Sequence, residues 1–380
     1  MPRFFLPYLG LCALLLLPIA GFSQAHTHQA ATPVEFPDIP GYLTLTTDLH
    51  QHTVFSDGSV WPDIRVMEAL REGLDAISLT EHLEYQPHQA DIPHPDRNRS
   101  FEIAMEEARD HELILIHGSE ITRSAPMGHS NAIFITDANA LLAGAPEVPF
   151  REAKNQGAFI FWNHPAWYAQ SPQGNPVLSD FQKARIRDGE LHGIEVINTT
   201  DYSEEALELA LKEGLTILGT SDIHGLIDWD YTEKGNHRPI TLVFAKARDA
   251  ESLKEALFAK RTVAVYNGLW VGREEWLQPL LRASVSIKEA GYLPGSQILK
   301  IVLENQTSSD LLFENTMPYT FYSSSPVFEI PSRGTYTLQV KTLEIRDSLE
   351  LQLKALGAYT APKEHPVISW KVVVPAHPGN

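Results

Sequence analysis

Short apolar runs alternate with helical patterns from residue 42 to residue 268, and this alternation limits the fold more than any other feature. We expect strands near 43–50, 75–80, 113–119, 130–136, 158–162, 193–199, 215–220, 240–246 and 262–266. Between them, one helical pattern starts at Pro62 and stops at Gly73, and another is capped by Ser203. Such alternation is typical of parallel strands joined by crossover helices. Because no glycine-rich dinucleotide turn follows the first strand, the sequence predicts a closed barrel rather than an open doubly wound sheet.

Histidines and acidic residues stand at the ends of these strands. The candidate metal ligands are His50, His52, Asp57, His82, Glu120, His129, His164, Asp222 and His224. Because parallel strands bring their carboxyl ends to one face of a barrel, we expect these side chains to form one cluster. The two-residue period of a strand places His50 and His52 on the same side, and Asp222 and His224 repeat that spacing. Nine ligands exceed the needs of one ion, so the sequence predicts two or three metal ions with a bridging carboxylate.

The charge balance excludes some classes of partner. The chain has 48 acidic and 30 basic residues, a formal net charge of -18, and 14 of its 16 histidines lie between residues 26 and 275. Such a charge repels the nucleic-acid backbone, so we expect no nucleic-acid polymer as a partner. Many carboxylates together with many imidazoles instead suit a site for several metal ions.

The sequence gives little support to a covalent mechanism. It lacks a G-x-S-x-G motif, and its single cysteine, Cys12, lies in a segment that we expect to be removed. Metal ions about 3.5–4 Å apart can clamp a phosphoryl group and lower the pKa of a bridging water. A metal-bridging hydroxide is therefore the nucleophile that we expect.

Seven short motifs occur in order along the same region. They are Asp48-Leu49-His50-Gln51-His52-Thr53, Ser56-Asp57-Gly58, Thr80-Glu81-His82, Gly118-Ser119-Glu120, Gly128-His129-Ser130-Asn131, Asn163-His164-Pro165 and Ser221-Asp222-Ile223-His224. In these motifs the sequence resembles the PHP (polymerase and histidinol phosphatase) family of metal-dependent phosphoesterases, over about residues 42–268. The resemblance implies an α/β fold, a distorted TIM-like (β/α)7 barrel, with a di- or trinuclear centre of Zn, Mn or Fe that hydrolyses phosphoesters.

The same resemblance implies how the ligands divide among the ions. It would place His50, His52, Glu120 and Asp222 on one ion, Glu120, His129 and His164 on a second, and Asp57, His82 and His224 on a third. The motif Thr80-Glu81-His82 departs from the family's more usual Thr-Asp-His. We therefore expect Glu81 at most to orient His82.

Other catalytic roles are predicted less directly. His82, His224 or Asp222 could protonate the leaving group, and the sequence does not choose among them. Arg123, in the loop after the third strand, is predicted to contact the phosphate, as are basic residues of the long segment 84–100. Aromatic residues near these loops could hold an aryl ester group or serve as ordinary packing; they are Trp162, Trp167, Tyr168, Tyr202, Trp229 and Tyr231.

The first 25 residues read as a secretory signal peptide. They begin with Met1-Pro2-Arg3, continue through a leucine-rich apolar run and end in Ser23-Gln24-Ala25. We expect cleavage before His26 and export to the periplasm or the exterior of a bacterium, with an uncleaved membrane anchor as the alternative. After cleavage we expect no membrane span. Residues 26–41 read as an N-terminal arm, and 42–275 as the catalytic barrel.

The last part of the chain, residues 276–380, has a different pattern. Short alternating runs occur at 284–288, 297–305, 310–315, 327–330, 335–341, 347–355 and 366–374. Seven short strands in about 100 residues are typical of a small all-β, immunoglobulin-like sandwich. This region has no ligand cluster, so we expect it to be structural.

Several functions remain open on the sequence alone. We favour a secreted phosphodiesterase, because export suits scavenging of phosphate from small organic phosphodiesters, and a phosphomonoesterase of the histidinol-phosphatase type is the first alternative. An amidohydrolase-like hydrolase would usually have a bridging lysine after the fourth strand, which Asn131 to Thr136 lack. A metal-binding protein without catalysis would have saturated ions and no open coordination position. The sequence does not indicate an oligomeric state.

Overall fold

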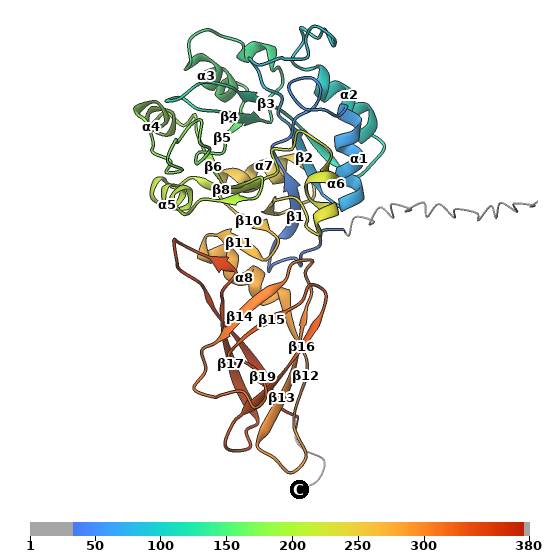
Figure 1. The fold of residues 1–380 in the computed structure, drawn as a ribbon, viewed down its shortest axis with the longest axis vertical. Helices are drawn as coiled ribbons and strands as arrows, with labels where there is room; N and C mark the ends of the chain where they lie inside the picture. The colour runs from blue at the N-terminus through green and yellow to red at the C-terminus, as the bar shows by residue number, and fades with distance from the viewer. Residues whose placement is uncertain (1–32, 376–380) are drawn as a thin grey trace, which may run out of the picture. The chain divides into compact units, whose positions relative to one another are not determined.

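A computed structural model describes residues 33–375 of the chain (Figure 1). The predicted signal peptide, 1–25, and the first part of the predicted arm lie outside these described residues. The remainder of the arm packs onto the fold: Val34 and Ile39 are buried, and the Val34 amide donates to the Glu72 carbonyl. None of the helices within the described residues is long and apolar enough to cross a membrane.

Seven strands form the predicted distorted barrel. In hydrogen-bonded order they are β1 (Leu43–Asp48), β2 (Ala76–Leu79), β3 (Ile114–Ile121), β4 (Ser130–Ile133), β5 (Phe159–Trp162), β6 (Gly193–Asn198) and β8 (Thr216–Thr220). The ring closes just beyond the ends of β8 and β1, where Ile223 and Gln51 form a parallel bridge. There the His52 amide donates to the Ile223 carbonyl and the Asp222 amide to the His50 carbonyl, each at 3.0 Å. Both predicted ligand pairs thus lie at the closure of the barrel.

Further strands extend the same sheet. The short β7 (Asp201–Tyr202) folds back on β6, while β9 (Ile240–Ala245), β10 (Thr262–Tyr266), β11 (Leu269–Gly272) and β18 (Ala358–Tyr359) continue outward from β1. The prediction that all nine strands run parallel is wrong for two of them, β4 and β9. β4 is antiparallel to both of its neighbours and β9 to β1, whereas β10, which is antiparallel to β9, runs in the same direction as β1.

The reversal of β4 matters for the site. His129 precedes β4, so in a parallel strand it would lie at the opposite end of the barrel from the other ligands. Because β4 is antiparallel, its start lies beside the carboxyl ends of β3 and β5. His129 therefore reaches the predicted cluster because β4 runs opposite to the direction that we expected.

Helices surround the barrel, and their bounds follow local signals. They are α1 (Pro62–Glu72), α2 (Arg99–Ala108), α3 (Val148–Asn155), α4 (Asp180–Arg187), α5 (Glu204–Glu213), α6 (Ile227–Asp230), α7 (Ala250–Phe258) and α8 (Glu274–Ser284), with short 3-10 turns at Asn139–Leu141 and Thr232–Lys234. Helix α1 begins at Pro62 and ends at Gly73, whose φ of 72° suits a residue without a Cβ. Helix α5 is capped by the Ser203 hydroxyl, which accepts from the Ala206 amide. In Figure 1, α1 and α2 lie beside each other, with α3, α4 and α5 across the barrel.

Apolar side chains fill the inside of the barrel. Leu45 of β1, Phe159 and Phe161 of β5, and Leu218 of β8 are fully buried in one cluster. Burying each such side chain stabilises the fold by roughly 1.5–3 kcal/mol. This packed interior holds the strands in place, so the polar residues at their ends have a rigid base.

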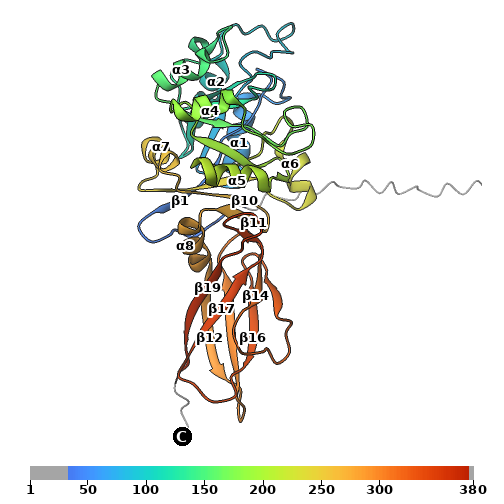
Figure 2. The same ribbon diagram turned by 90° about the vertical axis from the view of Figure 1, so that its left-hand side faces the viewer.

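Seven strands of the C-terminal part form two sheets, as predicted; they are drawn in orange to red in Figure 2. One sheet contains β12 (Val285–Tyr292), β13 (Ile298–Asn305) and β16 (Thr335–Lys341); the other contains β15 (Val327–Ile330), β14 (Leu311–Asn315), β17 (Ser348–Ala355) and β19 (Val367–Val373). Alternate residues point inward, so Leu299, Ile301 and Leu303 of β13 are buried while their neighbours are partly exposed. The β-sandwich prediction is confirmed.

The predicted boundary between barrel and sandwich, at 275/276, falls within α8. The strands on either side of it share contacts: β18 pairs with β11, and the indole of Trp270 donates to the Ser309 hydroxyl at 2.9 Å. One continuous apolar cluster includes Leu280 of α8, Val263 of β10 and Phe313 of β14. The described residues, 33–375, accordingly cluster as one compact unit.

Candidate metal centre

All nine predicted ligands converge at one end of the barrel. They fall into four overlapping groups of side chains whose ligand atoms lie within 4.8 Å of one another; these groups are His52, Asp57, His82 and His224; His50, Glu120 and His164; His50, His52 and Asp222; and His82, Glu120 and His129. The residues come from the ends of five strands and from the loop after β1. The fold therefore brings together residues that lie up to 174 positions apart in the sequence.

The closure of the barrel creates the first group. The Nε2 atoms of His50 and His52 lie 3.0 Å apart, and each lies 3.1 Å from Asp222 Oδ1. Both imidazoles are fully buried. Three ligand atoms thus face one another, as the strand period predicted.

Glu120, fully buried at the end of β3, lies at the middle of the cluster. Its Oε2 is 2.7 Å from His82 Nδ1 and 3.5 Å from His52 Nε2. Its Oε1 is 2.7 Å from His129 Nδ1 and 3.6 Å from His164 Nε2. The two oxygens of one carboxylate therefore face different sets of imidazoles, which is the position that a bridging ligand would occupy.

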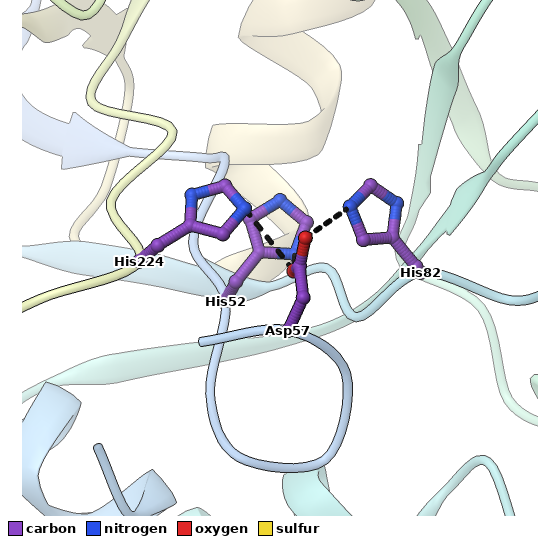
Figure 3. A group of neighbouring side chains, drawn as sticks. All are labelled: His52, Asp57, His82 and His224. Atoms are coloured by element: carbon purple, nitrogen blue, oxygen red, sulfur yellow. Dashed lines mark ion pairs between the residues drawn. The ribbon is translucent and has the colours of Figure 1, made fainter. Parts of the chain in front are cut away.

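Asp57 organises the third side of the cluster (Figure 3). It lies in the loop after β1, with Oδ1 3.1 Å from His224 Nε2 and Oδ2 3.4 Å from His82 Nε2. The ring of His52 stacks against both neighbouring imidazoles, at centroid distances of 4.3 Å to His224 and 4.5 Å to His82. Asp57 and three imidazoles from three segments of the chain thus share one small space.

Several buried atoms of this cluster are better placed to bind a cation than to form a hydrogen bond within the protein. Glu120 Oε2, Asp57 Oδ1 and His129 Nδ1 are inaccessible to solvent, and although each lies within 3.1 Å of another candidate ligand atom, none of them forms a hydrogen bond of suitable geometry with the described residues. Unpaired buried polar atoms are rare because each loses its hydration without replacement. Imidazole nitrogens and carboxylate oxygens are also the donors that Zn, Mn and Fe accept. The residues present therefore fit a group of divalent ions.

The electrostatics of the cluster agree with this chemistry. Burial, together with the neighbouring His224 and His82, lowers the pKa of His52 to about 3, so its imidazole is neutral and its lone pairs are available. Burial opposes a charge on His82, yet Glu120 and Asp57 raise its pKa to about 11. Burial likewise opposes ionisation of Asp57, but His224 and His82 hold its pKa well below the ordinary value. The carboxylates are thus ionised, and their field attracts cations.

Backbone strain occurs at two of the ligands. His164 has φ of 28° and Asp222 has φ of 51°, both in the left-handed region that side chains with a Cβ seldom adopt. Such conformations cost on the order of 1–3 kcal/mol each and persist only when the surrounding structure imposes them. Here they follow the ends of β5 and β8 and direct both side chains into the cluster.

A solved structure from Bacteroides vulgatus shares this architecture. It is a two-domain protein containing a predicted PHP-like metal-dependent phosphoesterase, 39% identical to this chain, with a TM-score of 0.84 and coverage of 90% of this chain and 99% of that one. The chain belongs to the PHP-like metal-dependent phosphoesterases. Residues 285–371 of this PHP-like phosphoesterase match the family model of an Ig-like domain.

Other comparisons are more distant. A candidate metal-dependent phosphoesterase from Bifidobacterium adolescentis is 18% identical, with a TM-score of 0.39, over 47% of this chain and 88% of that one. An amidohydrolase from Chromobacterium violaceum is 15% identical, with a TM-score of 0.33, over 47% of this chain and 87% of that one. None of the curated proteins matches the sequence significantly.

Sequence reasoning missed Glu195, a buried residue of β6 in this PHP-like phosphoesterase. Its Oε1 lies 2.8 Å from His50 Nδ1 and accepts from the Thr220 hydroxyl at 2.6 Å. Its Oε2 accepts from the His164 amide at 2.6 Å and from the Asn198 amide group at 2.9 Å. A carboxylate on the far nitrogen of a ligating imidazole fixes the ring and its tautomer. The available signal was an acid between Ile194 and Val196 in an otherwise apolar strand.

A second set of buried charges, here called the arginine network, lies beneath the ligand-bearing backbone. It consists of Asp48, Arg65, Glu68, Glu72 and Arg238. Arg238 pairs with Glu72 at 2.6 Å and with Asp48 at 3.1 Å, and Arg65 pairs with Glu68 at 2.7 Å. Arg65 also donates to the carbonyls of His52 and Ile223, and Asp48 accepts from Ser221. The network thus supports both ligand pairs at the barrel closure, a role that the sequence did not indicate.

Glu81 does not contact His82 in the manner expected. Its carboxylate accepts from the Thr53 hydroxyl at 2.5 Å, from the Thr53 amide at 3.1 Å and from the Ser56 hydroxyl at 2.6 Å. These bonds fix the loop that carries Asp57. Nδ1 of His82 instead meets the Thr122 hydroxyl at 2.7 Å. Glu81 therefore positions a neighbouring ligand, not the histidine beside it in sequence.

Arg123 lies apart from the cluster. Its guanidinium pairs with Glu84 at 2.9 Å and donates to the Ala143 carbonyl, and it does not line the cavity described below. In segment 84–100, Arg97 likewise donates to the backbone, at Leu83 and His94. The structure thus does not bring these predicted phosphate donors to the ligands.

A cavity of about 660 Å³ opens beside the cluster. It is lined by Asp57, His82, His129, His164, Pro165, Ala166, Trp167, Tyr168, Glu195, Val196, Asn198, Thr199, Asp201, Tyr202, Ser203, Asp222 and His224. One side of the cavity therefore consists of candidate ligands, including the predicted leaving-group acids His82, Asp222 and His224. The lining also includes three of the six aromatic residues that the sequence predicted near these loops, Trp167, Tyr168 and Tyr202, and the described lining residues include no lysine or arginine.

Proposed function

We propose that this PHP-like phosphoesterase is an exported enzyme that hydrolyses small organic phosphodiesters with two or three divalent ions, Zn, Mn or Fe. One observation carries the proposal: nine residues with nitrogen and oxygen ligand atoms, Glu120 at their middle, converge beside a cavity that can admit a small molecule, and three of their buried atoms form no hydrogen bond of suitable geometry. Family membership supports phosphoester hydrolysis over the amidohydrolase and metal-storage alternatives.

The nine residues would hold the ions. His50, His52 and Asp222 would bind one side of the centre, His129 and His164 would share Glu120, and Asp57, His82 and His224 would bind the remaining side. Bound divalent ions would neutralise phosphoryl oxygens and lower the pKa of a water molecule. Glu195 would keep the His50 ring oriented, and the arginine network would hold both ligand pairs at their spacing.

The charge of the cavity supports diesters over monoesters. A phosphodiester carries one negative charge and a phosphomonoester close to two at neutral pH. Enzymes that bind the more highly charged group commonly add arginine or lysine donors. Among the described residues that line this cavity there is neither, and Asp201 adds a negative charge. A less charged phosphoryl group is therefore the better fit, and the monoesterase is the second candidate.

Hydrolysis of bis(4-nitrophenyl) phosphate and of 4-nitrophenyl phosphate, before and after chelation, tests this proposal. We expect cleavage of the diester with the larger kcat/KM, loss on chelation and recovery with added Zn, Mn or Fe. Much faster cleavage of the monoester would reverse the order of the two candidates. No cleavage of either ester by metal-loaded protein would contradict the phosphoesterase function. Cell fractionation of the native host would test export, and a product retaining residues 1–25 would contradict it.

A further inference from the structure

The cavity wall next to the candidate ligands is aromatic. Trp167 directly contacts two ligand imidazoles, with ring centroids 5.6 Å from His129 and 5.2 Å from His164. Tyr168 lies at 67° to the Trp167 ring, with centroids 5.5 Å apart. The apolar surface therefore begins at the ligands themselves. A group bonded directly to the ester oxygen could therefore lie against Trp167.

The loop that carries Trp167 is held in place by its own hydrogen bonds. The Trp167 amide donates to the His164 carbonyl at 2.9 Å, and the Ser171 amide donates back to the Trp167 carbonyl at 2.8 Å. The Gln170 side chain joins the Trp162 indole and His164 Nδ1, at 3.0 and 2.9 Å. The indole is nevertheless 40% exposed, so its face is available. A fixed, open aromatic surface suits stacking with a planar ring.

The same cavity offers little to protonate a leaving group. If the nine candidate ligands bind metal, the remaining ionisable lining residues are Tyr168, Glu195, Asp201 and Tyr202. Glu195 is engaged by four neighbours, and burial raises the pKa of Tyr202, which makes it a weaker acid. Tyr168 and Asp201 are exposed at the outer side of the cavity. A leaving group must then depart as an anion, and a phenol, with a pKa near the value of about 10 for tyrosine, does so more readily than an alkanol.

We propose that the enzyme acts on aryl phosphoesters, with the aryl group held against Trp167. This inference rests on the proposed function and names its substrate class. In the reaction, a water oxygen bonds to phosphorus, the bond from phosphorus to the aryl oxygen breaks, and that oxygen leaves with the electron pair as a phenolate. The two protons of the water pass to solvent or to the products. A second anionic group on the substrate is disfavoured, because no described lining residue is a lysine or an arginine.

Binding of two non-hydrolysable probes tests the aromatic contact. Phenylphosphonate and methylphosphonate are titrated calorimetrically into metal-loaded protein. Partial burial of a phenyl ring is worth about 1.4 kcal/mol or more, so we expect phenylphosphonate to bind at least about tenfold more tightly. Trp167→Ala should remove most of this preference, and Trp167→Phe should retain it. Trp229→Ala, which removes an exposed indole that does not line the cavity, should leave it unchanged.

Kinetics with a series of substituted phenyl methyl phosphates tests the leaving-group argument. We expect kcat to rise steeply as the pKa of the phenol falls, and the corresponding dialkyl phosphate to be cleaved at least about 100-fold more slowly. Equal binding of the two phosphonates, or equal cleavage of aryl and alkyl diesters, would overturn the inference while leaving a phosphoesterase intact. Failure to cleave any phosphoester, aryl or alkyl, would instead overturn the proposed function.

Discussion

Two buried groups of charges lie within a few residues of each other at the barrel closure, and they differ in how their carboxylates are neutralised. In the arginine network, Asp48, Glu68 and Glu72 all pair with guanidinium groups of the chain. In the metal centre, Asp57, Glu120 and Asp222 pair only with imidazoles among the described residues. The carboxylates of the first group are neutralised by arginines, which are permanently charged. Those of the second group form no ion pair with a lysine or an arginine among the described residues. The first is therefore structural, and the second is suited to cations taken from solution.

Asp222→Asn should have the largest effect on function. The substitution removes a negative ligand but keeps the side-chain shape, and asparagine tolerates the left-handed φ of 51° at this position. We expect lower metal content and at least about a 10³-fold loss of kcat/KM, because bound ions supply several kcal/mol of transition-state stabilisation. Elemental analysis and hydrolysis assays measure both.

The matched control is Asp228→Asn, which removes an aspartate of α6 that pairs with Arg71 at the surface. It should leave metal content and activity unchanged. If the Asp222→Asn protein kept full metal content and full activity, the claim that the second group binds metal ions while the first is structural would be wrong.

Arg238→Met should have the largest effect on stability. It leaves Asp48 and Glu72 buried without their guanidinium partner, and breaking a buried pair in this way costs about 3–5 kcal/mol. Denaturant unfolding should show this loss, and added metal should not restore it. Arg71→Met, which breaks an exposed pair with Asp228, should cost less than about 1 kcal/mol. If both variants lost the same amount of unfolding free energy, the arginine network would not have the structural role that we assign to it.

Glu195→Gln should weaken metal binding without unfolding the protein. The change replaces a carboxylate that holds His50 Nδ1, and losing such a partner typically lowers metal affinity by about 10–100-fold. Competitive titration with a chromogenic chelator measures the affinity. Asp201→Asn removes a charge from the same cavity without contacting His50 and should leave the affinity unchanged. Equal changes in both variants would indicate a general effect of cavity charge.

The ligands could be predicted from the sequence because each stands at the end of a recognisable apolar run and belongs to an ordered motif. The direction of β4 was harder to predict. The loop from Ile121 to Ser130 is too short for a crossover helix, which indicates that β3 and β4 are antiparallel. However, α3 lies between β4 and β5, and a strand–helix–strand order usually indicates a parallel pair. Glu195, Asp48 and Arg238 were missed because a charged residue inside a strand or loop gives no local sign of its partner. Their pairings span 145 to 190 positions and depend on the closed barrel.

The partly buried His192, which lies away from the carboxylates, should have a smaller effect on stability. The imidazole of His192 packs against Phe159 and Phe258, its Nδ1 accepts from the Ile160 amide, and burial lowers its pKa to about 4. Because the folded-state pKa lies below the unfolded value of about 6.5, the unfolded state binds more protons between these values. Stability should therefore fall by about 1–3 kcal/mol as the pH drops from 6.5 to 4.

His192→Asn tests this contribution, because an amide oxygen can accept the Ile160 bond but does not titrate. Chemical unfolding at several pH values should give a flatter profile for the variant over this window. An unchanged profile would assign the acid sensitivity to other groups.

Metal content of the purified protein, measured by elemental analysis together with thermal unfolding before and after chelation, tests the central claim most directly. The account predicts two to three Zn, Mn or Fe ions per chain, and ions at 100 times their dissociation constant should stabilise the fold by about 2.7 kcal/mol per site. Chelation should lower the unfolding temperature, and resupplied ions should restore it. A chain that contains no metal and binds none when supplied with these ions would contradict the claim.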